Sequence, residues 1–329
     1  MRIGIDLLGG DAPPLDLFEA ILSLRSELPK SCSLLLFTTP DLTHGFRSRI
    51  TPEPGVNIEL EEVSQVIEMG DSPLTAVRRK RGSSMAVGLK MVRDGRLDAL
   101  VSTGNTGALV ASATLTLPLL PGVERPGLLA SIPSISGHVA VIDIGANLYP
   151  KTHHLWQFAR MGAAYQRCTE QIARPKIGLL NIGTEEMKGT KGIQEAYQYL
   201  VEKLRHSDTP FVGNIEGKDA FTGLVDVIIS DGFTGNVFLK TAEGISLFIL
   251  QYLRKAFEAV LTPDVERVLE SLNQRVNYSE YPGALVCGVE GVVVKCHGYS
   301  DQQAVASGVK GAIRLIEGNL IGKMKEALS

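Results

Sequence analysis

The chain has 329 residues, which exceeds the usual size of one simple domain, so we expect one large α/β unit or two subdomains. Apolar residues make up 44% of the chain and charged residues 21%, a balance typical of a soluble protein with a sizeable core. The formal net charge of −3 gives no electrostatic reason to expect a nucleic-acid partner.

Cysteine usage and hydropathy favour a soluble, cytoplasmic protein. The cysteines lack the spacing of metal sites and are predicted to be reduced thiols: Cys32, Cys168, Cys287 and Cys296. The opening stretch MRIGIDLLGG has too short an apolar run for a signal peptide. The most apolar long segment, 245–261, should not span a bilayer, because it contains Gln251, Arg254, Lys255 and Glu258.

Short β-type runs alternate with longer helical patterns along the whole chain. Strands are predicted at 3–7, 34–38, 58–60, 99–101, 128–131, 139–144, 177–180, 211–213, 225–229 and 292–295. Helices are predicted at 15–28, 73–79, 84–94, 107–117, 153–173, 193–205, 234–260, 263–274 and 301–317. Several strands are apolar on both faces, as in a sheet covered by helices on each side. The sequence therefore predicts a three-layer αβα sandwich with a mostly parallel sheet, as one unit or as two subdomains hinged near 118–126 and 277–283.

Four predicted strand-to-helix junctions are rich in glycine and small polar residues: 9–11, 102–107, 181–192 and 230–240. In open parallel α/β sheets, ligands bind at the carboxyl ends of the strands, where loops lead into helix N-termini. Glycine lets backbone N–H groups approach a ligand, and a helix N-terminus adds unpaired donors and a partial positive charge. We therefore expect an anionic ligand among these junctions.

The second junction is the strongest candidate for the anion site. VSTGNTGALVASA places six small polar or glycine residues between an apolar strand and an alanine-rich helix. Asn, Thr and Gly also make ordinary turns and N-caps, so the argument depends on several such junctions occurring in one sheet. The predicted anion-binding residues are Ser102, Gly104, Asn105, Thr106 and Gly107.

The third junction contains a lysine, Lys188. Its order, Lys188-Gly189-Thr190, does not match the phosphate loop of nucleotide-binding proteins, in which glycine precedes lysine. Lys188 is either a solvated charge beside Glu185 and Glu186 or a point charge for a phosphate oxygen. Spacing alone leaves both interpretations open.

The fourth junction, SDGFTGNVFLK, places Asp231, Thr234 and Asn236 around two glycines, the second of which is Gly235. Asp231 is either an N-cap or turn residue, or it orients a substrate or a water with Asn236 and Lys240 nearby. Both interpretations stay open at the level of sequence.

Other catalytic signatures are missing from the sequence. There is no G-x-S-x-G and no HExxH motif, so neither a covalent nucleophile nor a metal site is expected. The lack of G-x-G-x-x-G weakens a dinucleotide-binding interpretation. His297 is the histidine most plausibly near a site, because glycine and a polar turn follow a strand there; a hydrogen-bonded structural histidine is the alternative.

Two segments of the sequence are candidates for contacts with partner molecules. VRRKRGSS at 77–84 concentrates four positive charges, which form either a solvated face or a contact with an acidic partner or phosphate. GISLFILQYLRKAFEAVL at 244–261 is apolar over more than one helical face, which is typical of a helix buried by the core and a second subunit. Interfacial membrane contact is the alternative. We expect the amphipathic segment at about 244–275 to make one of these two contacts.

Eight motifs follow one another along nearly the whole chain: IDLLGGD at 5–11, RRKRGSSM at 78–85, VSTGNTGALVASA at 101–113, DIGAN at 143–147, LLNIGTEEMKGT at 179–190, VGNIEGKD at 212–219, SDGFTGNVFLKTAEG at 230–244 and GVEGVVVKCHGYSD at 288–301. By these motifs the chain resembles the bacterial phosphate acyltransferases (acyl-[acyl-carrier-protein]–phosphate transacylases) of phospholipid synthesis. The resemblance implies that acyl-ACP and inorganic phosphate react to give acyl phosphate and free acyl carrier protein.

The resemblance also implies a fold and a set of partners. The fold would be similar to that of phosphotransacetylases and isocitrate/isopropylmalate dehydrogenases, an αβα sandwich in two subdomains that forms a homodimer. The partners would be acyl carrier protein, inorganic phosphate and the membrane glycerol-3-phosphate acyltransferase that takes the product. No metal, nucleotide or other cofactor is implied, and the association with the membrane would be loose and peripheral.

The resemblance and the junctions together suggest roles for individual residues. Phosphate is expected at the helix start 102–107, with Lys188 neutralising its charge so that it attacks the thioester directly. Asn236, or the backbone amides of the loop 232–235, are expected to donate to the tetrahedral oxyanion. Asp231 would orient Lys188 or Asn236, while Thr234, Gly235 and His297 would contact substrate.

The chain departs from the family pattern at two places. Ala12 follows the first GGD, where family members often have histidine, and Leu148-Tyr149 follows DIGAN, where they often have aspartate, so we assign no catalytic role to either place. Three alternative functions remain. They are a phosphotransacylase that uses acyl-CoA, a decarboxylating dehydrogenase that would need NAD and clustered aspartates, and a non-catalytic membrane-associated scaffold.

Overall fold

The computed structural model describes residues 1–51, 56–276, 283–296 and 302–328. The strands are β1 (Arg2–Asp6), β2 (Ser33–Thr38), β3 (Asn57–Glu62), β4 (Ala99–Ser102), β5 (Gly127–Ser134), β6 (Gly137–Ile142), β7 (Ile177–Leu180), β8 (Phe211–Ile215), β9 (Val227–Ile229), β10 (Ala284–Cys287) and β11 (Val292–Lys295). The α-helices are α1 (Pro14–Leu24), α2 (Pro40–Arg49), α3 (Pro73–Arg79), α4 (Ser84–Arg93), α5 (Thr106–Thr116), α6 (Thr152–Thr169), α7 (Lys191–Leu204), α8 (Gly232–Phe257), α9 (Pro263–Val276), α10 (Gln302–Glu317) and α11 (Leu320–Leu328). Two 3-10 helices are η1 (Gly217–Phe221) and η2 (Glu258–Val260).

The strands form one sheet in the order β3-β2-β1-β4-β11-β10-β5-β6-β9-β7-β8. One block of parallel strands consists of β3, β2, β1, β4 and β11. A second parallel block consists of β6, β9, β7 and β8. The antiparallel strands β10 and β5 join the two blocks. The predicted mostly parallel sheet is confirmed, whereas the division into subdomains stays a prediction.

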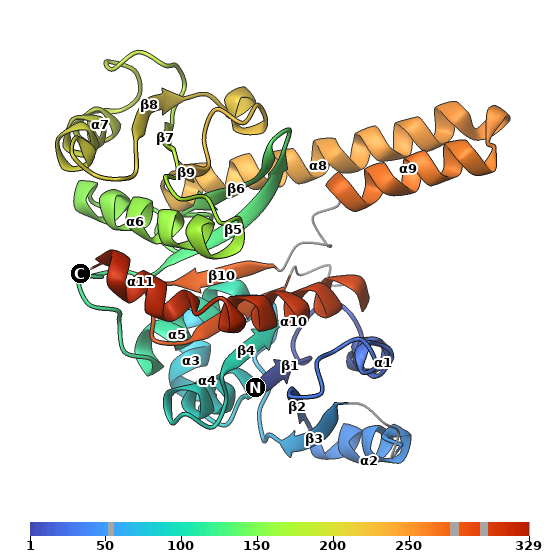
Figure 1. Cartoon of the computed structure of the whole chain (residues 1–329). Helices are drawn as coiled ribbons and strands as arrows, with labels where there is room; N and C mark the ends of the chain where they lie inside the picture. Colours follow the sequence, from blue (N-terminus) through green and yellow to red (C-terminus); the bar gives the residue numbers. More distant parts are fainter. Residues whose placement is uncertain (52–55, 277–282, 297–301, 329) are drawn as a thin grey trace.

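Helices cover both faces of this sheet (Figure 1). Ala99 and Val101 of β4 belong to a core cluster that includes residues of α1, α6 and α10. Leu100, between them, belongs to a second cluster that includes residues of α4 and α5. Because successive side chains of a strand point to opposite faces, the sheet separates two cores. The three-layer arrangement predicted from the sequence is confirmed.

Polar residues directly after two strands cap the helices that follow. The Asn105 side chain accepts the N–H of Ala108 at 2.9 Å, and the Asp231 carboxylate accepts the N–H of Thr234 at 2.8 Å. Such caps satisfy donors that the first helical turn leaves unpaired. The cap at Asp231 places the start of α8 at Gly232, two residues before the predicted start.

Apart from the short 3-10 helix η1, three elements escape the sequence patterns: α2, β10 and α11. The strand patterns do not include β10, and its pairing with β11 and β5 identifies it as a strand. Helix α2 is mostly polar and buries only Thr43 and Phe46. Helix α11 is separated from α10 by Asn319, whose positive φ of 52° interrupts the helical run.

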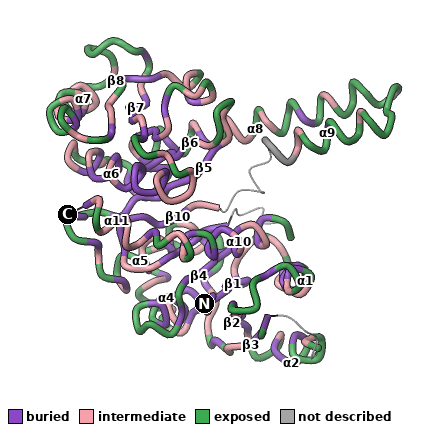
Figure 2. Tube along the Cα trace, viewed as in Figure 1, coloured by how far each residue is buried: buried purple, intermediate pink, exposed green. Residues whose placement is uncertain are grey.

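Helices α8 and α9 form a hairpin that projects from the body of the molecule (Figure 1). Leu250 and Leu269 are buried, while most of the hairpin surface is exposed (Figure 2). Its exposed apolar side chains are Ile245, Leu247, Phe248, Ile249, Tyr252, Phe257, Val260, Leu261 and Val268. The predicted amphipathic segment thus consists of two helices that η2 separates. Among the described helices, none combines the length and hydropathy that crossing a bilayer requires.

Candidate active site

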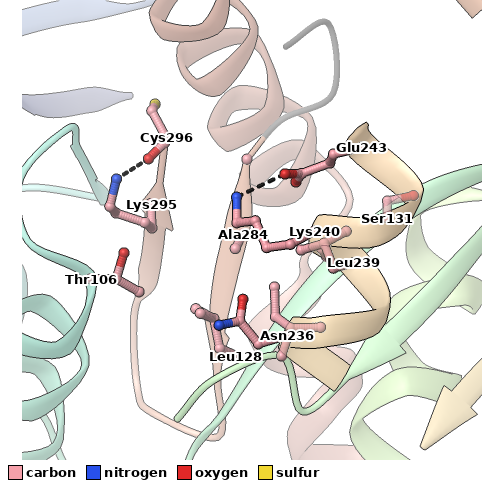
Figure 3. A pocket seen from close by; sticks show the side chains of 13 residues that line it. Thr106, Leu128, Ser131, Asn236, Leu239, Lys240, Glu243, Ala284, Lys295 and Cys296 are labelled. Carbon is pink, nitrogen blue, oxygen red and sulfur yellow. Dashed lines mark hydrogen bonds and ion pairs between the residues drawn. The ribbon is translucent and has the colours of Figure 1, made fainter. Parts of the chain in front are cut away.

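A cavity of about 110 Å³ lies between the first turns of α8, the start of α5 and the end of β11. Figure 3 shows the Lys295 and Thr106 side chains on one side of this cavity and those of Asn236, Lys240 and Glu243 on the other. The Lys240 ammonium lies 2.8 Å from a carboxylate oxygen of Glu243. We call this space the Thr106–Lys295 pocket. It combines a helix N-terminus, cationic groups and an amide in one place.

Three polar side chains stand in register beside this pocket, at the carboxyl ends of β1, β4 and β11. Asp6 pairs with Ser102, and Ser102 pairs with Lys295. The Ser102 hydroxyl donates to one Asp6 oxygen at 2.7 Å, and the N–H of Leu8 donates to the other at 3.1 Å. Burial raises the pKa of Asp6, whereas hydrogen bonds from Ser84, Ser102 and Leu8 and the charge of Lys295 act in the opposite direction.

Lys295 is only 4% exposed, and its ammonium donates to the main-chain oxygens of Thr103, at 3.2 Å, and Cys296. Burial lowers the pKa of Lys295 to about 8. Our sequence reasoning missed this residue and selected His297, which lies outside the described residues. The available signal was a single charge at the end of the otherwise apolar strand VVVK, because a buried strand rarely carries a charge without a partner.

Asn105 shapes the turn before α5 and does not present its amide to the pocket. Its side-chain oxygen caps α5, and its nitrogen donates to the main-chain oxygens of Met69 at 2.8 Å and Asp71 at 3.4 Å. The amide is therefore already engaged at both ends, and a side-chain contact between Asn105 and phosphate, as expected from the sequence, would require breaking one of these bonds.

Ser102 and Gly104 are likewise engaged within the protein. The Ser102 hydroxyl donates to Asp6 and accepts the N–H of Gly104 at 3.2 Å. Thr106 lines the pocket, and Gly107 is exposed. Within the described part of the chain, the N–H groups of Thr106 and Gly107 have no hydrogen-bond partner, as expected for the first turn of a helix. These two donors are the part of the predicted anion site that remains available to a ligand.

The loop after β6 fixes the start of α8 and explains the DIGAN motif. The buried Asp143 carboxylate accepts the N–H groups of Leu128, Gly145, Ala146 and Asn147. Burial raises the pKa of Asp143, and these hydrogen bonds act in the opposite direction. A Cβ atom at Gly235 would lie 2.0 Å from the main-chain oxygen of Asp143. Gly235 thus lets α8 approach this loop and brings Asn236 to the pocket.

Asp231 and Thr234 line a different, larger cavity of about 1110 Å³. The Asp231 carboxylate accepts both the N–H and the hydroxyl of Thr234, each at 2.8 Å. This cavity is also lined by Phe233 and Val237, whereas Asn236 of the same helix lines the smaller pocket. The first turns of α8 therefore form a wall shared by the two cavities, and the structure separates Asp231 from Asn236.

Lys188 lines neither of these two cavities. Its side chain is 49% exposed, and its ammonium lies 3.9 Å from a Glu185 carboxylate oxygen. The neighbouring Gly189 and Thr190 line the larger cavity. The structure therefore places Thr106 and Asn236 in the same pocket but leaves Lys188 at the surface.

One cluster in the described residues offers ligand atoms of the kind that bind metals: Glu124, His153 and His154. The Nδ1 atom of His154 accepts the N–H of Lys151 at 3.0 Å, so the hydrogen of the neutral ring lies on Nε2, which faces Glu124 at 3.4 Å. A nitrogen that carries a hydrogen has no lone pair for a metal. The cluster is therefore built as a hydrogen-bonded contact at the start of α6.

Comparisons with known proteins agree with this architecture. A family model described as "Fatty acid synthesis protein" matches residues 1–323. The phosphate acyltransferase of Chlamydia abortus is 39% identical over 331 residues, covering 100% of this chain and 99% of the relative. A phosphotransacetylase from Streptococcus pyogenes has a TM-score of 0.61 at 14% identity, over 96% of this chain and 94% of that chain. A 4-hydroxythreonine-4-phosphate dehydrogenase from Klebsiella pneumoniae has a TM-score of 0.52 at 9% identity, over 96% of this chain and 97% of that chain.

The two solved structures show the shared fold alone, because their sequence identity to this chain is low. The family assignment depends on the full-length match to the family model and on the identity to the curated relative. The chain belongs to the bacterial phosphate acyltransferase family, whose members are transferases of fatty acid and phospholipid synthesis.

Proposed function

We propose that this protein transfers a fatty acyl group from acyl-[acyl-carrier-protein] to inorganic phosphate, giving acyl phosphate and free carrier protein. The single observation that supports this most is the Thr106–Lys295 pocket, which Thr106, the first residue of α5, lines together with the buried Lys295. Such a pocket suits a small anion of high charge density.

The proposed step needs no covalent intermediate on the protein. A phosphate oxygen attacks the thioester carbonyl carbon, a C–O bond forms, and the C–S bond breaks with its electron pair leaving on sulfur. The thiolate then takes a proton from water. Because a thiol has a pKa of roughly 8.5, the thiolate is a fair leaving group and a strong general acid is not required.

Asn236 is the proposed donor to the oxyanion of the tetrahedral intermediate. It lines the pocket from the side opposite Thr106 and Lys295 (Figure 3). Removing one such donor typically costs about 2.7–4 kcal/mol of transition-state stabilisation, or about 10²–10³ in kcat. Asn236→Ala is therefore expected to lower kcat by this factor with little change in the urea midpoint. A variant with wild-type kcat would remove Asn236 from the mechanism.

We also propose that the protein acts in the cytoplasm as a homodimer, with a loose peripheral association with the membrane. The exposed apolar surface of the α8–α9 hairpin supports a contact of this kind. The acyl phosphate would then pass to a membrane glycerol-3-phosphate acyltransferase, since its long chain favours a lipid environment.

The test is to mix purified protein with palmitoyl-ACP and inorganic phosphate and to measure acyl phosphate and free thiol together. Equal amounts of both products, formed only when phosphate is present, are expected. Thiol release without phosphate would indicate a hydrolase, and binding to lipid vesicles with no thioester consumed would indicate a scaffold. Palmitoyl-CoA in place of palmitoyl-ACP tests the donor, and an equal kcat/KM for both would overturn the carrier-protein assignment.

A further inference from the structure

Lys295 is a buried cation beside the pocket, and its position follows from the sheet. It ends β11, which lies next to β4 in the interior of the sheet, and it pairs in register with Ser102. Its ammonium reaches the main-chain oxygen of Thr103, in the turn that leads into α5. The same turn ends at Thr106, whose side chain lines the pocket with Lys295 (Figure 3).

The groups around Lys295 satisfy its charge only in part. An ammonium has three hydrogens, and in the described part of the chain two of them have acceptors, the oxygens of Thr103 and Cys296. The nearest buried carboxylate, Asp6, is held by Ser102 and Leu8, and no ion pair joins it to Lys295 among the described residues. A buried charge without an ion-pair partner is costly, and function is a common reason to retain one.

We propose that Lys295 is the cation that binds the phosphate in the Thr106–Lys295 pocket, together with Thr106 at the start of α5. This inference rests on the proposed function and deepens it, because it assigns the charge of the phosphate site to β11 and not to the loop that carries Lys188. Lys295 is then a catalytic residue that touches the attacking phosphate.

The alternative is that Lys295 is structural and only links the turn at Thr103 to the end of β11. The two roles differ in what they predict for phosphate. Loss of a structural lysine would lower stability and kcat and would change the KM values of the two substrates alike. Loss of a phosphate-binding lysine would raise the KM for phosphate and leave the KM for the thioester nearly unchanged.

The test measures the binding of inorganic phosphate, by thermal shift and calorimetry, and the KM for each substrate in Lys295→Met and Lys295→Arg. Loss of the charge is expected to weaken phosphate binding and raise its KM by about 10- to 150-fold, the range for hydrogen bonds between charged groups. Lys295→Arg keeps the charge and is expected to restore part of the affinity. Wild-type phosphate KM in a folded Lys295→Met protein would overturn the inference.

Lys176→Met is the matched control. Lys176 is a half-buried lysine that, like Lys295, donates to a main-chain oxygen, that of Gly223 at 3.1 Å, but it does not line the pocket. Its loss is expected to leave the phosphate KM within threefold of wild type. Lys188→Ala separates the two candidate cations: it is expected to lower kcat without raising the phosphate KM, and a large rise in KM there alone would transfer the role to Lys188.

A second measurement uses the wild-type protein and does not depend on the folding of a variant. The charged groups that face Lys295 are Asp6 and Asp11 from the β1 side and Lys240 and Glu243 from α8, with the Cys296 thiol beside it. Because Lys295 loses its charge as the pH rises through about 8, the phosphate KM is expected to rise there. In Lys295→Arg, which keeps every other group, this rise should vanish because a guanidinium stays charged. A rise that persists in this variant would contradict the inference.

The outcomes keep this inference separate from the proposed function. Phosphate that binds to wild type but not to Lys295→Met, in a protein that transfers no acyl group, would leave the site intact and refute the function. Acyl transfer to phosphate with an unchanged phosphate KM in Lys295→Met would support the proposed function and refute the role of Lys295.

Discussion

Asp231 has two interpretations at the level of sequence, an N-cap and a catalytic role, and the structure shows the N-cap. A carboxylate after a strand and before a glycine suits both roles, and only the structure shows that both of its oxygens receive hydrogens from Thr234. Whether Asp231 takes part in catalysis can be tested, because aspartate and asparagine are equally good N-caps.

Asp231→Asn is expected to keep wild-type stability and a kcat within threefold of wild type. Asp231→Ala should lower the free energy of unfolding by about 1 kcal/mol, the usual effect of a lost N-cap. Urea denaturation and the acyl transfer assay measure the two effects. A large loss of kcat in a stable Asp231→Asn protein would support the catalytic role predicted for Asp231.

Burial of the Lys295 ammonium also has a consequence for stability. The drop in its pKa from 10.5 to about 8 corresponds to a penalty of roughly 3 kcal/mol for keeping it charged in the folded state. Between pH 8 and pH 10.5 the unfolded chain binds more protons than the folded one. The penalty is therefore full below about pH 8 and disappears as the pH rises towards 10.5.

Without phosphate, the stability of the wild type relative to Lys295→Met is therefore expected to rise by roughly 3 kcal/mol between pH 8 and 10.5. Parallel urea titrations of the two proteins over this range check the difference and cancel the contributions of other titrating groups. A constant difference would show that Lys295 is not desolvated in the folded state.

At the scale of secondary-structure elements, α8 contributes both to the Thr106–Lys295 pocket and to the projecting hairpin. Its first turns are held against the loop after β6, and its last turns leave the body of the protein as half of the hairpin. Gly235 lies in the first turn and Gly244 near the middle of the same helix, so they form a natural pair for comparison.

Gly235→Ala is expected to be strongly destabilising, because its Cβ would lie 2.0 Å from the Asp143 main-chain oxygen and force α8 away from the loop. Gly244→Ala meets no atom within 4 Å and should gain up to about 1 kcal/mol from the higher helix propensity of alanine. Thermal unfolding of the two variants provides the measurement. Similar stabilities for both would mean that the start of α8 is not fixed by this contact.

The elements that the sequence predicted correctly are those with a strong local pattern. The apolar strands β1, β4 and β11 and the helices α4 and α7 follow from their own residues, and the resemblance to phosphate acyltransferases is confirmed by the comparisons. The strand β10 was not predicted; the structure identifies it as a strand by its pairing with β11, which follows it closely, and with β5, which is distant in the sequence.

The same limit applies to the site. The turn at 102–107 and Asn236 were predicted from glycine and small polar residues, which leave a local signature. The only local signal for Lys295 is the single charge at the end of VVVK, and its register with Ser102 and its burial come from the sheet. The roles assigned to Lys188 and the residues of the larger cavity stay predictions.

At the scale of the whole molecule, the projecting hairpin is the feature that a single chain does not explain. Phe248 and Tyr252 lie on its exposed surface with their ring centroids 6.1 Å apart, next to Ile245 and Ile249. A helix surface of this composition is usually covered by another protein or by lipid. We expect the hairpins of two copies to cover each other.

Light scattering of the purified protein should give the mass of a dimer of the 35.4 kDa chain. Replacing both Phe248 and Tyr252 with serine should yield monomers with an unchanged body, because these side chains contribute nothing to the buried cores. A monomeric wild type that floats with anionic vesicles would instead assign the hairpin to the membrane.

The place of β10 and β11 in the sheet also governs how the chain can be made. These strands come late in the sequence, yet they fill the middle of the sheet, between β4 and β5. Until β10 and β11 have been synthesised, β4 and β5 each have an open strand edge that can pair with other chains. Because Ala284 of β10 and Lys295 of β11 line the Thr106–Lys295 pocket, the wall of this pocket is complete only once the chain has been made to residue 295.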